Sequence, residues 1–229
     1  MKPLAGLRMH NPSRPAAAAA APAGAVPPGM IACEDIASSP AFTRLAEVPG
    51  VRHELRYAGT NNFSGRVLYA GLDCAWIRTE AARGLAQAAA WLDAQRPGWR
   101  LLVLDALRPQ RIQEAIWADV GGTEAAQWFA NPAQGSIHSF GMAVDVTLVD
   151  ARGRELDMGS GYDEMSPLSM PSLHAEHLAL GRLSAEQLAA RGWLHAAMTR
   201  GGFAGISNEW WHFDHGDRVA VRRELPRVW

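Results

Sequence analysis

The sequence predicts a single-domain α+β fold in which helices flank a central antiparallel sheet. Helical and strand patterns are mixed along the chain, without the regular alternation that is typical of a parallel α/β fold. Hydrophobic residues make up 48% of the 229 positions, which is enough for one sizeable core. From Met30 onward no change in composition marks a second domain, and about 200 residues is a normal domain size.

Charge and cysteine content exclude several classes of protein. The chain has 22 basic and 23 acidic residues, so it lacks the basic excess that binding to nucleic acid requires. No apolar run approaches the ~20 residues of a membrane-spanning helix. Two cysteines, Cys33 and Cys74, are too few for a four-cysteine zinc site, so any metal must be bound by histidine and carboxylate. The oligomeric state is left open.

Residues 1–29 are expected to form a disordered tail that precedes a domain over residues 30–229. The segment holds six consecutive alanines, Ala16–Ala21, among prolines that prevent a continuous helix. A cleaved targeting peptide is the alternative, because three basic residues precede the alanines. A secretory signal, however, needs ~7–15 uninterrupted apolar residues. We therefore favour an uncleaved tail and a cytoplasmic location, with a periplasmic location as the alternative.

The first half of the domain is predicted to contain two helices and a strand. Thr79 is expected to cap a helix that runs to Arg96, where a proline and a glycine end it. A short apolar strand over Trp99–Asp105, a turn at Arg108-Pro109 and a second helix over Gln110–Val120 follow.

The second half is predicted to contain two strands and a helix. Met142–Val149 alternates, so its valines face the core and Asp145 faces the opposite side. A capping box that begins at Ser184 predicts a helix ending at Gly201-Gly202. The aromatic segment Asn208–Phe213 is expected to be a strand.

Residues with metal-binding chemistry lie in two short motifs. His138 and Asp145 are seven positions apart, and Gly141 permits a tight turn that brings them together across a hairpin. His212 adds a second imidazole, and Glu209 adds a second carboxylate. Two histidines and an aspartate leave one zinc position for water, with a glutamate to take its proton. That arrangement is typical of catalytic zinc rather than of a closed structural site.

Strand geometry and the other histidines of the chain both bear on this site. Residues three apart in a strand face opposite sides, so we predict an irregularity at Trp210-Trp211 that lets Glu209 and His212 share one cavity. The other six histidines are expected to be surface or core residues. A helical metal pair at His174 and His177 is conceivable from their spacing, but no nearby motif supports it.

These motifs resemble those of a known enzyme family. S-x-H-x-x-G-x-A-x-D over Ser136–Asp145, followed by E-W-W-H, is similar to the VanX-type zinc D-alanyl-D-alanine dipeptidases. The resemblance covers about residues 35–213. Leu107 replaces a tyrosine that is frequent in the family, a departure that touches no proposed ligand. Three further segments match family signatures: Asn62–Gly65, Asp105–Pro109 and Met158–Asp163.

The resemblance implies one zinc ion per chain, bound by His138, Asp145 and His212, with Glu209 as the general base. Arg108 is permanently charged and suits stabilisation of the oxyanion. A dipeptide carries a charge at each end, and the resemblance implies a residue set for both: Asp163 for the ammonium, and Ser136 and Tyr57 for the carboxylate.

The expected function is zinc-dependent hydrolysis of D-alanyl-D-alanine to two D-alanines in cell-wall metabolism. Two alternatives remain. One is a carboxypeptidase that trims peptidoglycan stem peptides, and the other is a non-catalytic zinc-binding module of the same fold. The signatures around Asn62 and Asp163 favour the dipeptidase, and the presence of Glu209 and Arg108 favours an enzyme.

Overall fold

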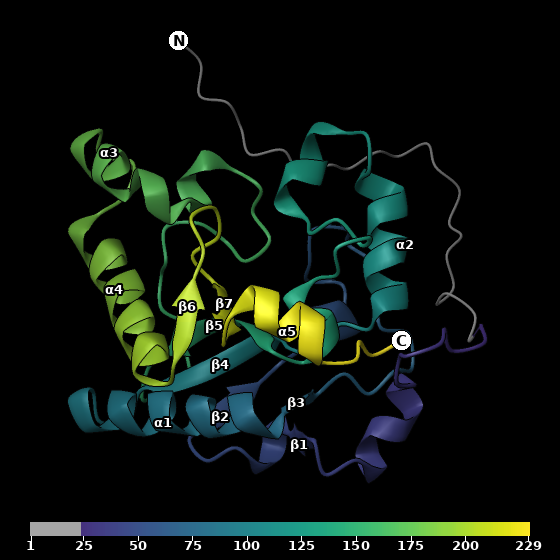
Figure 1. The fold of residues 1–229 in the computed structure, drawn as a ribbon. Helices are drawn as coiled ribbons and strands as arrows, with labels where there is room; N and C mark the ends of the chain where they lie inside the picture. The colour runs from purple at the N-terminus through teal and green to yellow at the C-terminus, as the bar shows by residue number, and fades with distance from the viewer. Residues whose placement is uncertain (1–23) are drawn as a thin grey trace.

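A five-stranded sheet runs through the centre of the computed structural model, which describes residues 24–229 (Figure 1). Only the β2–β4 pair is parallel, and the other pairs are antiparallel, so the predicted α+β fold is confirmed with one parallel edge. Most of the predicted 1–29 tail lies outside the described residues. The strands lie in the order β2 (Val51–His53), β4 (Arg100–Asp105), β5 (Ala143–Val149), β7 (His212–His215) and β6 (Phe203–Gly205), while β1 (Phe42–Arg44) and β3 (Trp76–Arg78) form a separate pair.

Helices α1 (Thr79–Gln95) and α4 (Ala185–Arg200) cover one face of the sheet (Figure 1). Alternate residues of β4 and β5, including Val103 and Val146, pack with them in the main core. Gly84 and Gly201 allow the two helices to approach closely, because a Cβ built at Gly84 lies 2.3 Å from the Gly201 carbonyl oxygen. Within residues 24–229, no helix is both long and apolar enough to cross a membrane.

The opposite face of the sheet is also buried, and it carries the polar site. Leu102, Leu104 and Val149 form a small apolar cluster there with Tyr162. Every residue of β5 is buried, so Asp145 faces away from the main core, as predicted, but into the protein rather than into solvent. The remaining helices are α2 (Gln110–Val120), α3 (His174–Ala179) and α5 (Arg218–Glu224).

Most predicted helix boundaries are confirmed, and one cap is wrong. The α2 bounds match, and Ser184 and Gln187 form the expected capping box of α4. Thr79, however, is the first helical residue, and Arg78 occupies the N-cap position. The Thr79 hydroxyl lies 3.0 Å from that of Thr43, so it links α1 to β1 instead of capping the helix.

The strand predicted over Asn208–Phe213 begins only at His212, and Trp210 and Trp211 lie in a bend. The indole Nε1 of Trp210 donates to the Ser160 hydroxyl at 3.0 Å, and both tryptophans are buried. Their aromatic character therefore reflects packing rather than strand pairing. The predicted irregularity at Trp210-Trp211 is confirmed, because the bend separates Glu209 from the strand.

The turn before β5 differs from the predicted hairpin. A 3₁₀ helix over Ile137–Phe140 carries His138, and Gly141 ends it at φ +69°. A side chain there would strain the backbone and place a Cβ 2.9 Å from the Phe42 ring. Gly141 thus sets the direction in which β5 leaves the turn.

Candidate active site

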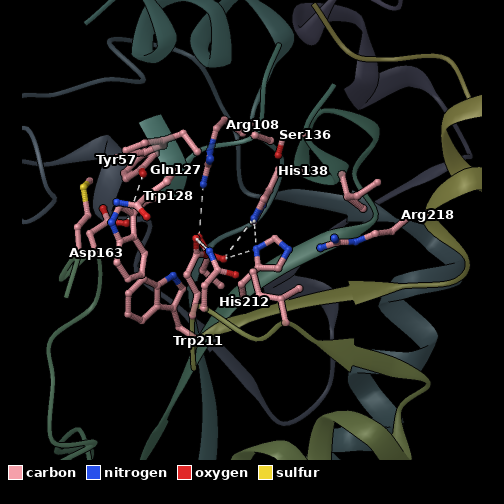
Figure 2. A pocket seen from close by; sticks show the side chains of 18 of the residues that line it. Tyr57, Arg108, Gln127, Trp128, Ser136, His138, Asp163, Trp211, His212 and Arg218 are labelled. Carbon is pink, nitrogen blue, oxygen red and sulfur yellow. Dashed lines mark hydrogen bonds and ion pairs between the residues drawn. The ribbon is translucent and has the colours of Figure 1, made fainter. Parts of the chain in front are cut away.

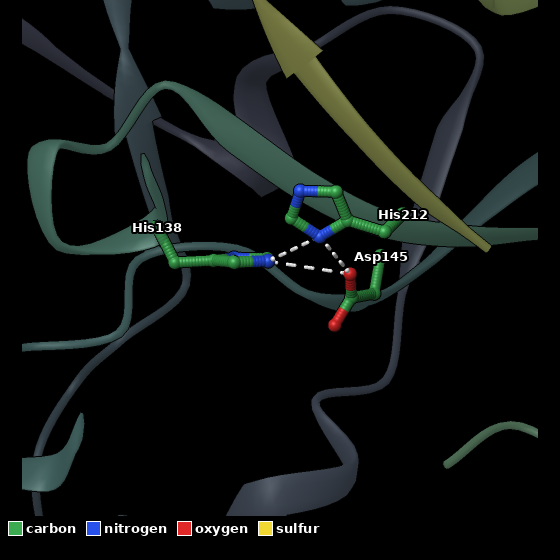
Figure 3. A group of neighbouring side chains, drawn as sticks. All are labelled: His138, Asp145 and His212. Atoms are coloured by element: carbon green, nitrogen blue, oxygen red, sulfur yellow. Dashed lines mark hydrogen bonds and ion pairs between the residues drawn. The ribbon is translucent and has the colours of Figure 1, made fainter. Parts of the chain in front are cut away.

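The register of the sheet creates the candidate metal site. Asp145 of β5 and His212 of β7 are direct cross-strand partners, so their side chains project from the same face. His138 reaches them from the 3₁₀ turn, and its Nε2 lies 3.1 Å from His212 Nδ1 and 3.2 Å from Asp145 Oδ1 (Figure 3). All three residues are buried, and their ligand atoms lie within 4.8 Å of one another. No other such cluster occurs in residues 24–229.

The outer ring nitrogens of both histidines are held by acceptors. His138 Nδ1 lies 2.7 Å from the Ala106 carbonyl oxygen, and His212 Nε2 lies 2.8 Å from Asp214 Oδ1. Each outer nitrogen therefore carries a proton, so the inner nitrogens are the atoms that would coordinate a bound cation in place of a proton. Two imidazole nitrogens and the Asp145 carboxylate then face one point, and this donor set fits a divalent cation.

Electrostatics at the same point favour positive charge. Burial opposes protonation of His212, yet Asp214 and Asp145 raise its pKa to about 10. The carboxylates of Asp145 and Asp214, on the two sides of the His212 ring, therefore stabilise a positive charge at this point. Asp145 also accepts a hydrogen bond from the Tyr162 hydroxyl at 3.1 Å.

Arg108 lies at the carboxyl end of β4, next to the metal cluster. Its guanidinium donates to Asp105 Oδ2 at 2.7 and 3.0 Å and lies 3.4 Å from Asp145 Oδ2. The Tyr57 ring covers it at 4.9 Å. These contacts hold a buried positive charge in a fixed orientation beside the ligands.

Glu209 directly precedes the bend at Trp210-Trp211 and lines the same pocket. Within residues 24–229, its carboxylate accepts a single hydrogen bond, from the Asn208 side-chain amide at 3.5 Å. Burial raises the pKa of Glu209 to about 7, with the charge of Asp145 adding to the rise and His212 opposing it. The carboxyl group is thus poised to exchange a proton near neutral pH.

Asp163 forms the opposite end of the pocket and has φ +57°, which is rare for a residue with a side chain. Its carboxylate accepts from the Phe63 backbone N–H at 3.3 Å and from the Tyr57 hydroxyl at 3.5 Å. Burial raises its pKa well above the ordinary value, and the charge of Asp145 adds to this. The structure places Tyr57 beside Asp163, whereas Ser136 lies on the His138 side (Figure 2).

All the residues predicted from the sequence to form the site line one cavity of about 230 Å³ (Figure 2). The other histidines of residues 24–229 do not line this cavity: His177, for example, contacts the Pro167 carbonyl oxygen, and His174 contacts Arg191. The cavity therefore joins the metal cluster to the residues expected to bind substrate: Tyr57, Arg108, Ser136, His138, Asp145, Asp163, Glu209 and His212.

Several residues that support the site were not predicted from the sequence. Asp214 could have been found, because it is two positions after His212 in a strand and must share its face. Asp105, which holds Arg108, lies opposite Asp145 in the sheet, but this pairing depends on a register that shifts after Val103. Arg218 and Arg222 of α5 also line the cavity, and no motif marked them.

Comparisons with known proteins agree with this geometry. Residues 39–228 match the model of the Peptidase_M15 family, described as D-Ala-D-Ala dipeptidase. The chain is 38% identical to a D-alanyl-D-alanine dipeptidase of Escherichia coli K12, covering 72% of this chain and 79% of the relative. It is 30% identical to one from Synechocystis, covering 62% and 70% respectively.

A solved structure of the LdcB LD-carboxypeptidase, described as revealing the basis of peptidoglycan recognition, is a more distant match. It has 15% identity and a TM-score of 0.46, and the match covers 87% of this chain and 78% of that one.

The match to the family model extends over most of the chain and includes every residue of the cavity. The chain therefore belongs to the Peptidase_M15 family of D-Ala-D-Ala dipeptidases and is a metallopeptidase.

Proposed function

We propose that this chain hydrolyses the dipeptide D-alanyl-D-alanine to two molecules of D-alanine, using one zinc ion. The observation that carries the proposal is the arrangement of the cavity. A buried carboxylate, Asp163, lies at one end, and the His138, Asp145 and His212 cluster lies beside an arginine and a glutamate. A cavity of about 230 Å³ suits a small ligand.

Zinc is the metal proposed for the cluster. Two neutral imidazoles and one carboxylate, with room for a further ligand, form a donor set that is typical of catalytic zinc. Zinc bound there would supply a Lewis acid and would lower the pKa of a water molecule toward neutrality. Asp214 and the Ala106 carbonyl oxygen keep both imidazoles in the tautomer that binding requires.

Proton transfer is assigned to Glu209. Its pKa of about 7 allows it to take a proton from the attacking water and return it to the leaving amine. Arg108 is assigned to the oxyanion that develops on the scissile carbonyl, because Asp105 holds its charge in place before the reaction.

Substrate orientation is assigned to Asp163. An ammonium group there would donate hydrogen bonds to the Asp163 carboxylate and to the Tyr57 hydroxyl oxygen, and its charge would offset the burial of the negative charge. In a stem peptide the corresponding nitrogen is an uncharged amide that carries an acyl chain. The cavity therefore favours a dipeptide over the carboxypeptidase alternative.

Incubation of zinc-loaded protein with D-Ala-D-Ala, L-Ala-L-Ala and a pentapeptide ending in D-Ala-D-Ala tests the proposal, with free alanine as the readout. D-Ala-D-Ala is expected to be cleaved with a kcat/KM about 100-fold or more above that of the pentapeptide. Equal values for these two substrates would support the carboxypeptidase instead.

The Glu209→Gln variant distinguishes an enzyme from a non-catalytic zinc-binding module. The variant is expected to keep one zinc per chain and to lose about 10²- to 10⁴-fold in kcat. Metal analysis and alanine release measure the two quantities separately. Wild-type turnover in Glu209→Gln would assign the base to another residue.

A cytoplasmic location is part of the proposal, since the alanine-rich segment before residue 30 lacks a continuous apolar stretch. Cell fractionation with sequencing of the mature N-terminus tests it. Recovery of a shortened chain from the periplasm would contradict it.

A further inference from the structure

Two arginines line the cavity but have no role in the proposed mechanism. Arg218 and Arg222 lie four positions apart on α5, so they occupy the same face of this short helix. Both line the cavity that contains His138, Ser136 and His212. Their positive charge therefore adjoins the place where substrate is expected to bind.

Arg222 is held next to Ser136. Its Nε and Nη2 donate to the carbonyl oxygen of Gly135, at 3.3 and 3.2 Å, and Gly135 directly precedes Ser136. Its Nη1 has no hydrogen-bond partner within residues 24–229. Arg222 is half-buried, which keeps the guanidinium partly shielded from water.

Arg218 is held next to His212. Its Nε donates to Asp214, the same carboxylate that fixes the outer nitrogen of His212. Neither of its Nη atoms has a partner in the described part of the chain. Figure 2 shows Arg218 approaching the ligands from the side opposite Asp163.

The cavity therefore has opposite charges at its two ends. Asp163 and Tyr57 form the anionic end, while Ser136 and Arg218 lie on the other side of the metal cluster (Figure 2). Arg222 lies next to Ser136 through its hydrogen bonds to Gly135. A dipeptide is a zwitterion that likewise carries opposite charges at its two ends. Guanidinium groups bind carboxylates through short, charge-assisted hydrogen bonds in a fixed geometry.

We infer that Arg222, assisted by Arg218, binds the C-terminal carboxylate of the substrate beside Ser136. The inference rests on the proposed dipeptidase function and adds a specificity determinant to it. With Asp163 at the other end, the pocket recognises both charged ends of the dipeptide. It therefore selects a substrate by its length as well as by its scissile bond.

The test compares D-Ala-D-Ala with D-alanyl-D-alaninamide, which has the same scissile bond but no C-terminal charge. The wild type is expected to prefer the acid. Arg222→Gln is expected to lower kcat/KM for the acid by about 10- to 100-fold, the contribution of one hydrogen bond to a charged group, and to leave the amide nearly unchanged. Arg218→Gln is expected to act in the same direction, and this second variant provides the test if Arg222→Gln does not fold.

Arg227→Gln is the matched control. Arg227 binds the same loop through the carbonyl oxygens of Pro132 and Ala133 but does not line the cavity. Its loss is expected to leave the acid-to-amide ratio unchanged. A purely structural role for Arg222 predicts an equal loss for both substrates in Arg222→Gln, and that result would overturn the inference.

A binding measurement removes turnover from the comparison. In the zinc-loaded Glu209→Gln background, calorimetry is expected to show weaker binding of D-Ala-D-Ala after Arg222→Gln and no change in binding of the amide.

If the wild type does not cleave D-Ala-D-Ala at all, the proposed function fails. If it cleaves the dipeptide and Arg222→Gln keeps the wild-type preference for the acid, only this inference fails.

Discussion

Glu209 and Asp163 are both buried carboxyl groups in one cavity, but their neighbours suit them to different tasks. Glu209 lies close to His212, whose positive charge opposes the effect of burial, so its pKa is about 7. Among residues 24–229, Asp163 accepts hydrogen bonds from one backbone N–H and one hydroxyl, and burial keeps its pKa well above the ordinary value until a cation binds. The first suits proton transfer, and the second suits recognition of an ammonium group.

The pH profile of kcat/KM is expected to report the titration of Glu209. The base must be ionised, so activity falls as the pH drops below its pKa. Since the charge of bound zinc lowers that pKa, the acid limb is expected at or below pH 7. Steady-state kinetics from pH 4.5 to 9 measure it. An acid limb that persists unchanged in the residual activity of Glu209→Gln would assign it to another group.

Asp163→Asn is expected to raise stability while reducing dipeptide hydrolysis. The folded-state pKa of Asp163 is raised, so its contribution to the stability of the fold is complete only below the unfolded-state pKa. That contribution is lost as the pH rises toward the folded-state pKa. Asparagine removes this loss and tolerates φ +57°. At pH 8 we expect a higher Tm for the substrate-free protein, by about 2–4 °C for each kcal/mol recovered.

Asp150→Asn is the control with the opposite sign. Hydrogen bonds from the backbone and side chain of Arg154 lower the pKa of Asp150, so its charge stabilises the fold above the unfolded-state pKa. Its loss is expected to reduce the Tm slightly at pH 8. A lower Tm for Asp163→Asn at that pH would contradict the sign assigned to the buried carboxylate.

At the scale of elements, strand register and helix packing position the site. The β5–β7 register places Asp145 opposite His212, and alternation along β7 places Asp214 on the same face. Behind the sheet, α1 and α4 cross at Gly84 and Gly201. The close approach of these helices thus supports the face of the sheet opposite the metal cluster.

Gly84→Ala is expected to destabilise the fold, by about 1–3 kcal/mol, because the new Cβ would lie 2.3 Å from the Gly201 carbonyl oxygen. Gly192→Ala is the matched control on α4. No atom lies within 4 Å of a Cβ built there, so the higher helix propensity of alanine is expected to add about 0.5–1 kcal/mol. Urea denaturation measures both. Equal effects of the two substitutions would contradict this account of the crossing.

At the scale of the whole molecule, the site unites residues that are far apart in the chain. His138 and His212 are 74 positions apart, and Tyr57 and Asp163 are 106 apart. Neither pair exists in the unfolded chain. A metal that binds the assembled cluster therefore stabilises the native state as a whole.

Zinc removal is expected to lower the Tm reversibly. When free zinc exceeds its Kd 1,000-fold, binding contributes about 4 kcal/mol. For a domain of this size that corresponds to a shift of about 8–16 °C. Thermal unfolding with chelator and after zinc is restored measures the shift. His212→Ala is expected to abolish the zinc response, and a wild-type Tm that is independent of zinc would exclude tight binding at this cluster.

The sequence alone predicted the elements and residues that depend on local chemistry. Capping at Ser184, the apolar run of β4, the alternation of β5 and the spacing of His138, Gly141 and Asp145 all act within a few residues. Each can be read from neighbouring side chains. The family motifs identified two further site residues that are distant in the sequence, His212 and Asp163.

Only the tertiary structure placed the residues whose surroundings come from distant segments. Tyr57 lies beside Asp163, the strand expected from Asn208 begins at His212, and Arg222 reaches the loop before Ser136. Nothing in the local sequence indicates these contacts between distant segments. Their roles arise from packing between elements, because charge, burial and hydrogen bonding are set by neighbours that meet only after the chain has folded.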